Sequence, residues 1–332
     1  MSVPTPLATS PAPLTMVLAE IAVVAVRRLS PSYVRVELGG PGLADFGVAG
    51  PLYDQRIKLL FPAADGRLPA VADADGSWLV GWRALPAERR GHLRTYTVRA
   101  VRGVGEDTRL VVDLVQHLAP GSSGPGARWA ARARVGDRIV VLAPRRGVAF
   151  GGIEFRPGDA RALLLAGDET AVPALCRILE DLPAGAVGAA FLEVPEVGDV
   201  QSVDHPAGVE VVWLPRGRGE VGARLQAAVL DHLGTVAAPH ALHVPPVEVD
   251  PDLWETPTYS SSHQEVGGPA AVTPARAGGD GDAAPLAGLY AWIAGESAVV
   301  TGLRRHLVRE LGMDRRQVAF MGYWRRGVAA RS

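Results

Sequence analysis

The chain has 332 residues, of which 48% are apolar and 21% charged, a composition typical of a folded protein long enough for two domains. Its formal net charge of −1 gives no electrostatic reason to expect nucleic acid or an anionic membrane surface as a partner. The single cysteine, Cys176, excludes an internal disulfide framework and any metal or iron–sulfur site that needs several cysteines.

The first segment, residues 1–17, is rich in Pro, Ser and Thr and predicts a flexible tail. It lacks the basic start of a secretory signal peptide. The apolar run from Leu14 to Val26 is interrupted by Glu20 and is too short to cross a bilayer. We therefore expect a cytoplasmic protein without stable membrane association.

Short alternating segments, separated by Gly and Pro turns, fill the next part of the chain. The most regular ones are residues 34–38, 57–61, 94–99, 110–115 and 138–142. Because no clear helical pattern falls between them, they predict a small antiparallel Greek-key β-barrel, which we assign to residues 18–155.

The pattern changes after that segment. A continuous apolar run at 162–166 is typical of a buried parallel strand, and it leads through a turn into a helix with one apolar face, with Thr170 as its candidate N-cap. The unit recurs in looser form from 209 and from 290, and one more strand is expected at 318–321. Strand, glycine turn and helix in succession predict a parallel α/β domain at 156–332. Residues 234–286 lack periodicity and predict a flexible insertion within that domain.

The strand pattern at 94–99 carries the first candidate site. Arg94 and Tyr96 fall on one face of the strand about 7 Å apart, and Thr97 follows on the other face. A planar cationic fork beside an aromatic ring suits a ligand with a phosphate and a flat ring. An ordinary half-buried strand with charged ends would show the same alternation.

A glycine-rich turn near residue 124 is the second candidate. Gly124 and Pro125 let backbone N–H groups approach a diphosphate, and a helix starting near Ala127 and carrying Trp129 would point its positive end there. Gly/Pro turns are common, so this pattern alone is weak. His117 closes the preceding strand and suits either a phosphate contact or a structural role.

The third candidate follows the buried strand at 162–166. Gly167, Asp168 and Thr170 form a strand-to-helix turn without the GxGxxG fingerprint, at the edge where α/β sheets bind nucleotides. Arg216 and Arg218 follow the next strand and could grip a 2′-phosphate, or could equally be solvated turn residues.

Other chemistries find little support. His240 and His243 lack a third ligand nearby, so we predict no metal site. No Ser–His–Asp or Cys–His arrangement can be picked out, and we expect no catalytic acid, base or nucleophile.

Taken together, the chain resembles the siderophore-interacting proteins, FAD-dependent ferric-siderophore reductases of the ferredoxin–NADP reductase superfamily. The resemblance rests on motifs in family order at residues 54–59, 94–97, 117–130, 136–137, 166–174, 213–216, 254–257, 294–296 and 322–327. One departure is Ala127, which stands where the family often has a serine.

The resemblance implies a flavin-binding barrel followed by a nicotinamide-binding domain. Arg94 would pair with the FAD diphosphate, Tyr96 would lie against the isoalloxazine, and Thr97 would hydrogen-bond near the flavin N5. The cofactor would carry the redox chemistry, with NADPH or NADH as donor.

The expected function is a ferric-siderophore reductase that releases Fe(II). At the basic C-terminal end, Arg325 and Arg326 are candidate contacts for an anionic chelate. A general flavin-linked diaphorase with a non-iron acceptor and a non-catalytic siderophore-binding protein remain alternatives. The sequence leaves open the siderophore, the oligomeric state, and whether a ferredoxin-like donor replaces the nicotinamide.

Overall fold

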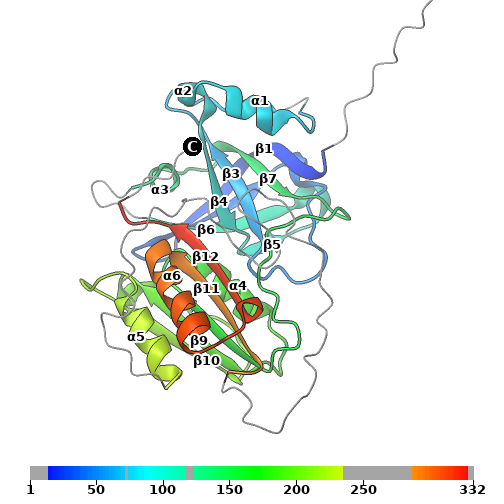
Figure 1. Ribbon diagram of the computed structural model, residues 1–332. Helices are drawn as coiled ribbons and strands as arrows, with labels where there is room; N and C mark the ends of the chain where they lie inside the picture. The colour runs from blue at the N-terminus through cyan, green and yellow to red at the C-terminus, as the bar shows by residue number, and fades with distance from the viewer. Residues whose placement is uncertain (1–13, 72–73, 117–122, 235–285, 328–332) are drawn as a thin grey trace, which may run out of the picture.

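Two sheets organise the molecule, one antiparallel and one parallel (Figure 1). The computed structural model describes residues 14–71, 74–116, 123–234 and 286–327. The predicted fold class, an antiparallel barrel-type sheet followed by a parallel α/β unit, is confirmed. The domain boundary that we place at 155/156 falls between the two sheets and stays a prediction.

The antiparallel sheet has the strand order β4-β3-β7-β1-β2-β6-β5. Its strands are β1 (Met16–Arg28), β2 (Tyr33–Gly39), β3 (Arg56–Phe61), β4 (His92–Thr97), β5 (Ala100–Arg102), β6 (Arg109–Val115) and β7 (Arg138–Pro144). Only Val98 and Arg99 separate β4 from β5, and their N–H groups donate to the carbonyls of Gln55 and Val111, each at 2.9 Å. The sheet therefore curls back on itself, because one continuous segment pairs first with β3 and then with β6.

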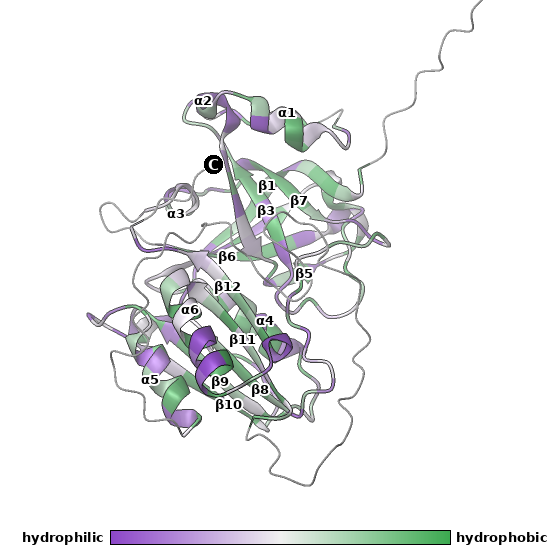
Figure 2. Cartoon of the chain, viewed as in Figure 1, coloured by the Kyte–Doolittle hydropathy of each residue, from purple (hydrophilic) through white to green (hydrophobic). Residues whose placement is uncertain are grey.

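Strand β1 was not predicted, and it begins inside the segment predicted as a tail. Its inner residues Val17 and Ile21 are buried in the barrel core, while Met16 and Leu18 pack on the outer side against α1 (Trp78–Ala84). Because both faces of β1 are covered, both carry apolar residues, and the strand lacks the alternation of apolar and polar residues that would predict it. In Figure 2, α1 and the short α2 (Ala87–Arg90) lie over this outer face of the sheet.

The parallel sheet has the order β10-β9-β8-β11-β12. Its strands are β8 (Ala162–Gly167), β9 (Gly188–Val194), β10 (Val209–Pro215), β11 (Leu289–Glu296) and β12 (Val318–Trp324). Helix α4 (Val172–Asp181) packs on one face, and α5 (Ala223–His232) and α6 (Ser297–Arg305) pack on the other. The order reverses between β8 and β11, and ligands of such sheets bind at that switch point, outside the carboxyl ends of the strands.

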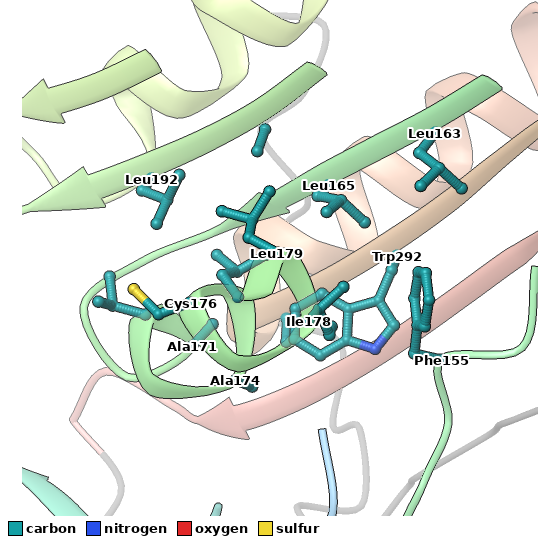
Figure 3. Packing of buried hydrophobic residues seen from close by; sticks show 14 of the residues in the cluster. Phe155, Leu163, Leu165, Ala171, Ala174, Cys176, Ile178, Leu179, Leu192 and Trp292 are labelled. Carbon is teal, nitrogen blue, oxygen red and sulfur yellow. The ribbon is translucent and has the colours of Figure 1, made fainter. Parts of the chain in front are cut away.

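Strand β9 was also missed, because its Ala-rich start is a weak strand signal and it contains a glutamate. Glu193 is fully buried and accepts hydrogen bonds from the N–H groups of Gly222 at 2.7 Å and Leu225 at 3.1 Å, near the start of α5. Cys176 lies in the apolar core on the α4 side of the sheet, beside residues such as Leu179 and Leu192 (Figure 3).

Buried polar groups join the two sheets. Asp54, just before β3, accepts hydrogen bonds from the N–H groups of Glu154 and Phe155 at 3.0 Å and from the indole of Trp292 on β11 at 3.1 Å. Figure 3 shows this indole beside Phe155. Elsewhere in the junction, Asp199 accepts from Ser32 at 2.8 Å, and the Tyr33 hydroxyl donates to the Glu169 carbonyl at 2.8 Å.

We predict that Asp54→Asn lowers the free energy of unfolding by about 1–3 kcal/mol, because the amide group that replaces one carboxylate oxygen cannot accept the same hydrogen bonds. Urea denaturation at neutral pH measures this change. The control Asp65→Asn lies in an exposed turn and should leave stability unchanged. Equal stability of Asp54→Asn and wild type would show that the junction does not depend on this carboxylate.

Candidate functional site

Arg94 and Tyr96 lie on the face of β4 that looks into the barrel. Arg94 pairs with Leu59 and Tyr96 with Ile57, two residues of the buried barrel core. Because paired residues in an antiparallel sheet share a side, the predicted common face of Arg94 and Tyr96 is confirmed. Thr95 lies on the opposite face, where its hydroxyl accepts from Lys58 Nζ at 3.3 Å.

The glycine turn reaches the same place. It leads into α3 (Pro125–Ala130), which starts two residues earlier than predicted. A methyl group added at Gly126 would stand 1.9 Å from the Tyr96 hydroxyl oxygen, so the backbone of α3 lies directly on that hydroxyl. The structure thus brings together two sequence candidates that lie about 30 residues apart.

The Phe61 ring on β3 packs between β4 and α3. This ring lies 5.1 Å from that of Trp129 and 5.9 Å from that of Tyr96, centroid to centroid. Sequence analysis missed Phe61 because an aromatic residue in an alternating strand is indistinguishable from ordinary core. Ala127 is buried beneath the same turn. His117, the remaining candidate here, lies outside the described residues.

The charge of Arg94 stands in a poorly solvated setting. Its guanidinium donates to the Leu93 carbonyl at 2.8 Å. Burial lowers the pKa of Arg94; Tyr96 opposes this shift, and the smaller effect of the Arg128 charge lowers the pKa further. Burial also raises the pKa of Tyr96 above its ordinary value, so the phenol stays neutral. An anion placed at Arg94 would relieve the cost of its buried charge.

These features fit a ligand with a diphosphate and a flat ring. Arg94 supplies a cationic fork, Tyr96 supplies a ring wall, and Gly126 leaves the space that a larger residue would take from the Tyr96 hydroxyl. Thr97, buried at the end of β4, is the next group along the strand. Its role beside the ring stays a prediction, as do those of Gly124 and Pro125 at the start of α3.

A second polar cluster lies at the carboxyl edge of the parallel sheet. Gly167 ends β8 and pairs with Ala294 of β11, which brings Asp168 beside the start of α6. The Asp168 carboxylate accepts from the Thr170 N–H at 2.9 Å and from the Thr170 hydroxyl at 2.6 Å. Thr170 is therefore bound to Asp168 instead of capping α4, whose N-cap is Ala171, and that part of the prediction is wrong.

Arg216 and Arg218 differ in exposure although both follow β10. The Arg216 guanidinium forms two hydrogen bonds with the buried Glu169 carboxylate, at 2.5 and 2.6 Å, and its side chain is only 10% exposed. Arg218 lies exposed in the turn. Of the two, Arg218 is the more accessible to a phosphate, and the predicted 2′-phosphate contact stays a prediction.

The C-terminal candidates sit at the end of β12. Arg325 is half-buried and Arg326 exposed, and the Arg326 N–H donates to Glu296 Oε1 at 3.2 Å. Sequence analysis did not assign roles to Glu296 or Trp324, although both fall within the motifs of the family resemblance. Within the described ranges, no cluster of three or more His, Cys, Asp or Glu residues could hold a metal, and no helix could span a membrane.

Comparison with known proteins assigns both halves of the chain. Residues 22–148 match the family model for a siderophore-interacting FAD-binding domain, and residues 160–327 match the model for siderophore-interacting proteins. FAD is therefore the cofactor of the barrel, and the contacts of Arg94 and Tyr96 with it stay a prediction.

Several relatives are similar over much of their length. An uncharacterized protein of Mycobacterium tuberculosis is 34% identical over 92% of this chain and 89% of its own. The ferric vibriobactin reductase of Vibrio cholerae is 30% identical over 60% of this chain and 68% of its own. The NADPH-dependent ferric-chelate reductase of Escherichia coli is 30% identical over 62% of this chain and 74% of its own.

Solved structures agree with this assignment. A siderophore utilization protein from T. fusca superimposes with a TM-score of 0.64 and 29% identity, covering 97% of this chain and 98% of its own. A ferredoxin NADP+ reductase from Neisseria gonorrhoeae has a TM-score of 0.52 at 13% identity, covering 93% and 99%, and shares the fold alone.

We predict that Arg94→Ala and Arg94→Lys purify with much less FAD than wild type. Lysine keeps the charge but cannot form the paired hydrogen bonds that a guanidinium makes with a phosphate. The ratio of flavin to protein absorbance measures occupancy, and Arg83→Lys, on the exposed side of α1, is the matched control. Full occupancy in both Arg94 variants would remove this residue from the site.

A second prediction concerns Gly126. Gly126→Ala should weaken FAD binding about tenfold or more, because the new methyl group displaces the Tyr96 ring. Adding Tyr96→Phe should restore part of the affinity, since it removes the oxygen that the methyl group would strike. Gly81→Ala, on the exposed side of α1, is the control, because nothing lies within 4 Å of its added methyl group. Similar flavin affinities for both alanine variants would contradict the close contact.

Proposed function

This chain belongs to the siderophore-interacting protein family, and from that premise we propose that it is an FAD-dependent ferric-siderophore reductase. It takes electrons from NADPH or NADH and passes them to the iron of a ferric siderophore, which releases Fe(II). The observation that carries the proposal is the convergence of Arg94, Tyr96 and Gly126 at one edge of the FAD-binding barrel. The printed names of the relatives from Vibrio cholerae and Escherichia coli support the iron acceptor.

In this proposal the protein binds and orients, while the cofactor supplies the electron chemistry. A flavin accepts two electrons from a nicotinamide and releases them singly, which no side chain can do. Arg94 pairs with the diphosphate, a contact worth about 1.5–3 kcal/mol. Tyr96 packs against the ring, which adds about 0.5–1.5 kcal/mol beyond its buried area. Thr97 hydrogen-bonds at the edge of the ring.

The donor binds at the switch point between β8 and β11, where the sheet order reverses. The turn from Gly167 to Thr170 forms one side of this site, and Arg218 is exposed in the turn after β10, the edge strand two positions from β8. The name of the Escherichia coli relative supports NADPH as donor. We place this reaction in the cytoplasm.

The acceptor is an anionic iron chelate. Arg325 and Arg326 follow β12 at the same edge of the sheet and supply positive charge to it. Reduction weakens the hold of hard oxygen ligands, because Fe(II) is a poorer partner for them than Fe(III).

The test is to reduce the purified yellow protein with NADPH without oxygen and then add ferric siderophores of several chelate classes with an Fe(II) trap. We expect at least one chelate to reoxidise the flavin and yield trapped Fe(II). If quinones or dyes reoxidise it and every chelate fails, the protein is a reductase with another acceptor. A colourless protein that binds ferric chelates would instead be a siderophore-binding protein.

We also predict a preference for NADPH over NADH in kcat/KM, if Arg218 contacts the 2′-phosphate. Arg218→Ala should then lower kcat/KM for NADPH about tenfold and leave the NADH value unchanged, because only NADPH carries the phosphate. Arg224→Ala, an exposed arginine on α5, is the matched control. Equal kinetics with the two donors in wild type would remove the assignment.

A further inference from the structure

The Asp168 carboxylate connects three separate segments at the edge of the parallel sheet. Besides Thr170 in its own turn, it accepts a hydrogen bond from the Glu296 N–H, at the start of α6, at 2.7 Å. The indole N–H of Trp324, the last residue of β12, donates to the same oxygen at 2.8 Å. The residue is 1% exposed, so these bonds are shielded from water.

The fit of this carboxylate is close. Gly295, at the end of β11, has φ 143°, and a methyl group added there would lie 2.6 Å from the carboxylate carbon of Asp168. No larger residue at position 295 could let the chain pass so near. The contact is therefore built by the backbone of β11 and by a side chain from the turn that follows β8.

The end of β12 is fastened to α6 as well. The Ser297 hydroxyl donates to the Trp324 carbonyl at 2.9 Å, and a methyl group added at Gly322 would lie 2.5 Å from that hydroxyl. Glu296 accepts from the Arg326 N–H with one carboxylate oxygen and from the Ala298 N–H at 2.7 Å with the other. These bonds fix the backbone of the segment that carries Arg325 and Arg326 where it leaves the sheet. The hydrogen bond from the Trp324 indole to Asp168 fixes the side chain just before that segment.

We propose that Asp168 is a positioning residue: by holding the Trp324 indole it fixes where the Arg325–Arg326 segment meets an anionic chelate. This assigns its carboxylate an internal task in place of direct contact with a nucleotide. The identity of the bound anion rests on the proposed function, whereas the hold on the indole does not.

The hold depends on the charge of the carboxylate. Burial and the adjacent charge of Glu169 raise the pKa of Asp168 to about 7, against the opposing effect of hydrogen bonds from Thr170 and Trp324. Charge-assisted hydrogen bonds are about twice as strong as neutral ones. A proton taken up from solvent therefore weakens the hold on the indole, so the segment is fixed above neutral pH and looser below it.

Other ionisable groups face this region from the surrounding elements. They are Glu169 of the same turn, Arg216 after β10, Glu193 on β9, Glu296 before α6, Tyr33 on β2 and Tyr323 on β12. The Glu169 carboxylate is itself paired with Arg216. The test must therefore change Asp168 alone and follow the indole directly.

The indole N–H of Trp324 can be observed by ¹H–¹⁵N NMR and identified as the signal that Trp324→Phe removes. In the holoprotein we expect this indole signal to move upfield as the pH falls through about 7, because burial raises the pKa of Asp168 to about that value. In Asp168→Asn it should stay at its low-pH position throughout. Asp314→Asn, an exposed aspartate before the 3₁₀ turn η5 (Arg315–Gln317), is the control and should titrate like wild type.

Kinetics supply the second readout. At pH 8, Asp168→Asn should raise KM for a ferric tris-catecholate about fivefold, as expected for one weakened hydrogen bond, while its FAD content stays that of wild type. Trp324→Phe should have the same effect, and the double variant should be no worse than Trp324→Phe alone.

An indole signal that ignores both pH and Asp168→Asn would overturn the proposal, as would additive effects in the double variant or a loss of FAD in place of a higher KM. If Asp168→Asn does not fold, the NMR titration of the wild-type indole signal and the KM of Trp324→Phe still test the proposal. If wild type reduces no ferric chelate, the proposed function fails, while the NMR titration still tests the hold on the indole.

Discussion

The structure depends on carboxylates buried where the barrel meets the parallel sheet. Asp54 brings together the strand β3, the link between the sheets and the core residue Trp292. A buried carboxylate is costly unless donors surround it, so each such residue fixes the positions of its donors. Asp199 does the same for Ser32 across the junction. The barrel and the sheet consequently meet in one defined arrangement.

That arrangement makes a two-part reductase site possible. The edge of the barrel that we propose for the flavin is formed by β4 and α3, and the carboxyl edge of the parallel sheet supplies the turn after β8 and the end of β12. In the proposed function, FAD at the first edge would receive electrons from a donor at the second. The charged groups follow this division, since Arg94 belongs to the barrel, and Arg218 and Arg325 belong to the sheet.

Sequence patterns predict the parts of this site whose signal is local. Alternation in one strand places Arg94 and Tyr96 on one face, and a buried apolar run followed by a turn places Asp168 at a sheet edge. Contacts between residues far apart in the sequence have no such local pattern. The close approach of the Tyr96 hydroxyl to Gly126 and the hydrogen bond between Trp324 and Asp168 are therefore visible only in the structure. Strand β1 was not predicted because both of its faces are covered by apolar residues, and β9 was not predicted because Glu193 interrupts its apolar pattern.

The central claim is that Arg94 and Tyr96, seated against Gly126, hold the flavin. The most direct measurement is a crystal structure of the protein with its bound cofactor. The account predicts the diphosphate at the Arg94 guanidinium and the isoalloxazine against the Tyr96 ring. A flavin bound elsewhere, or a different group over this pair of side chains, would contradict it.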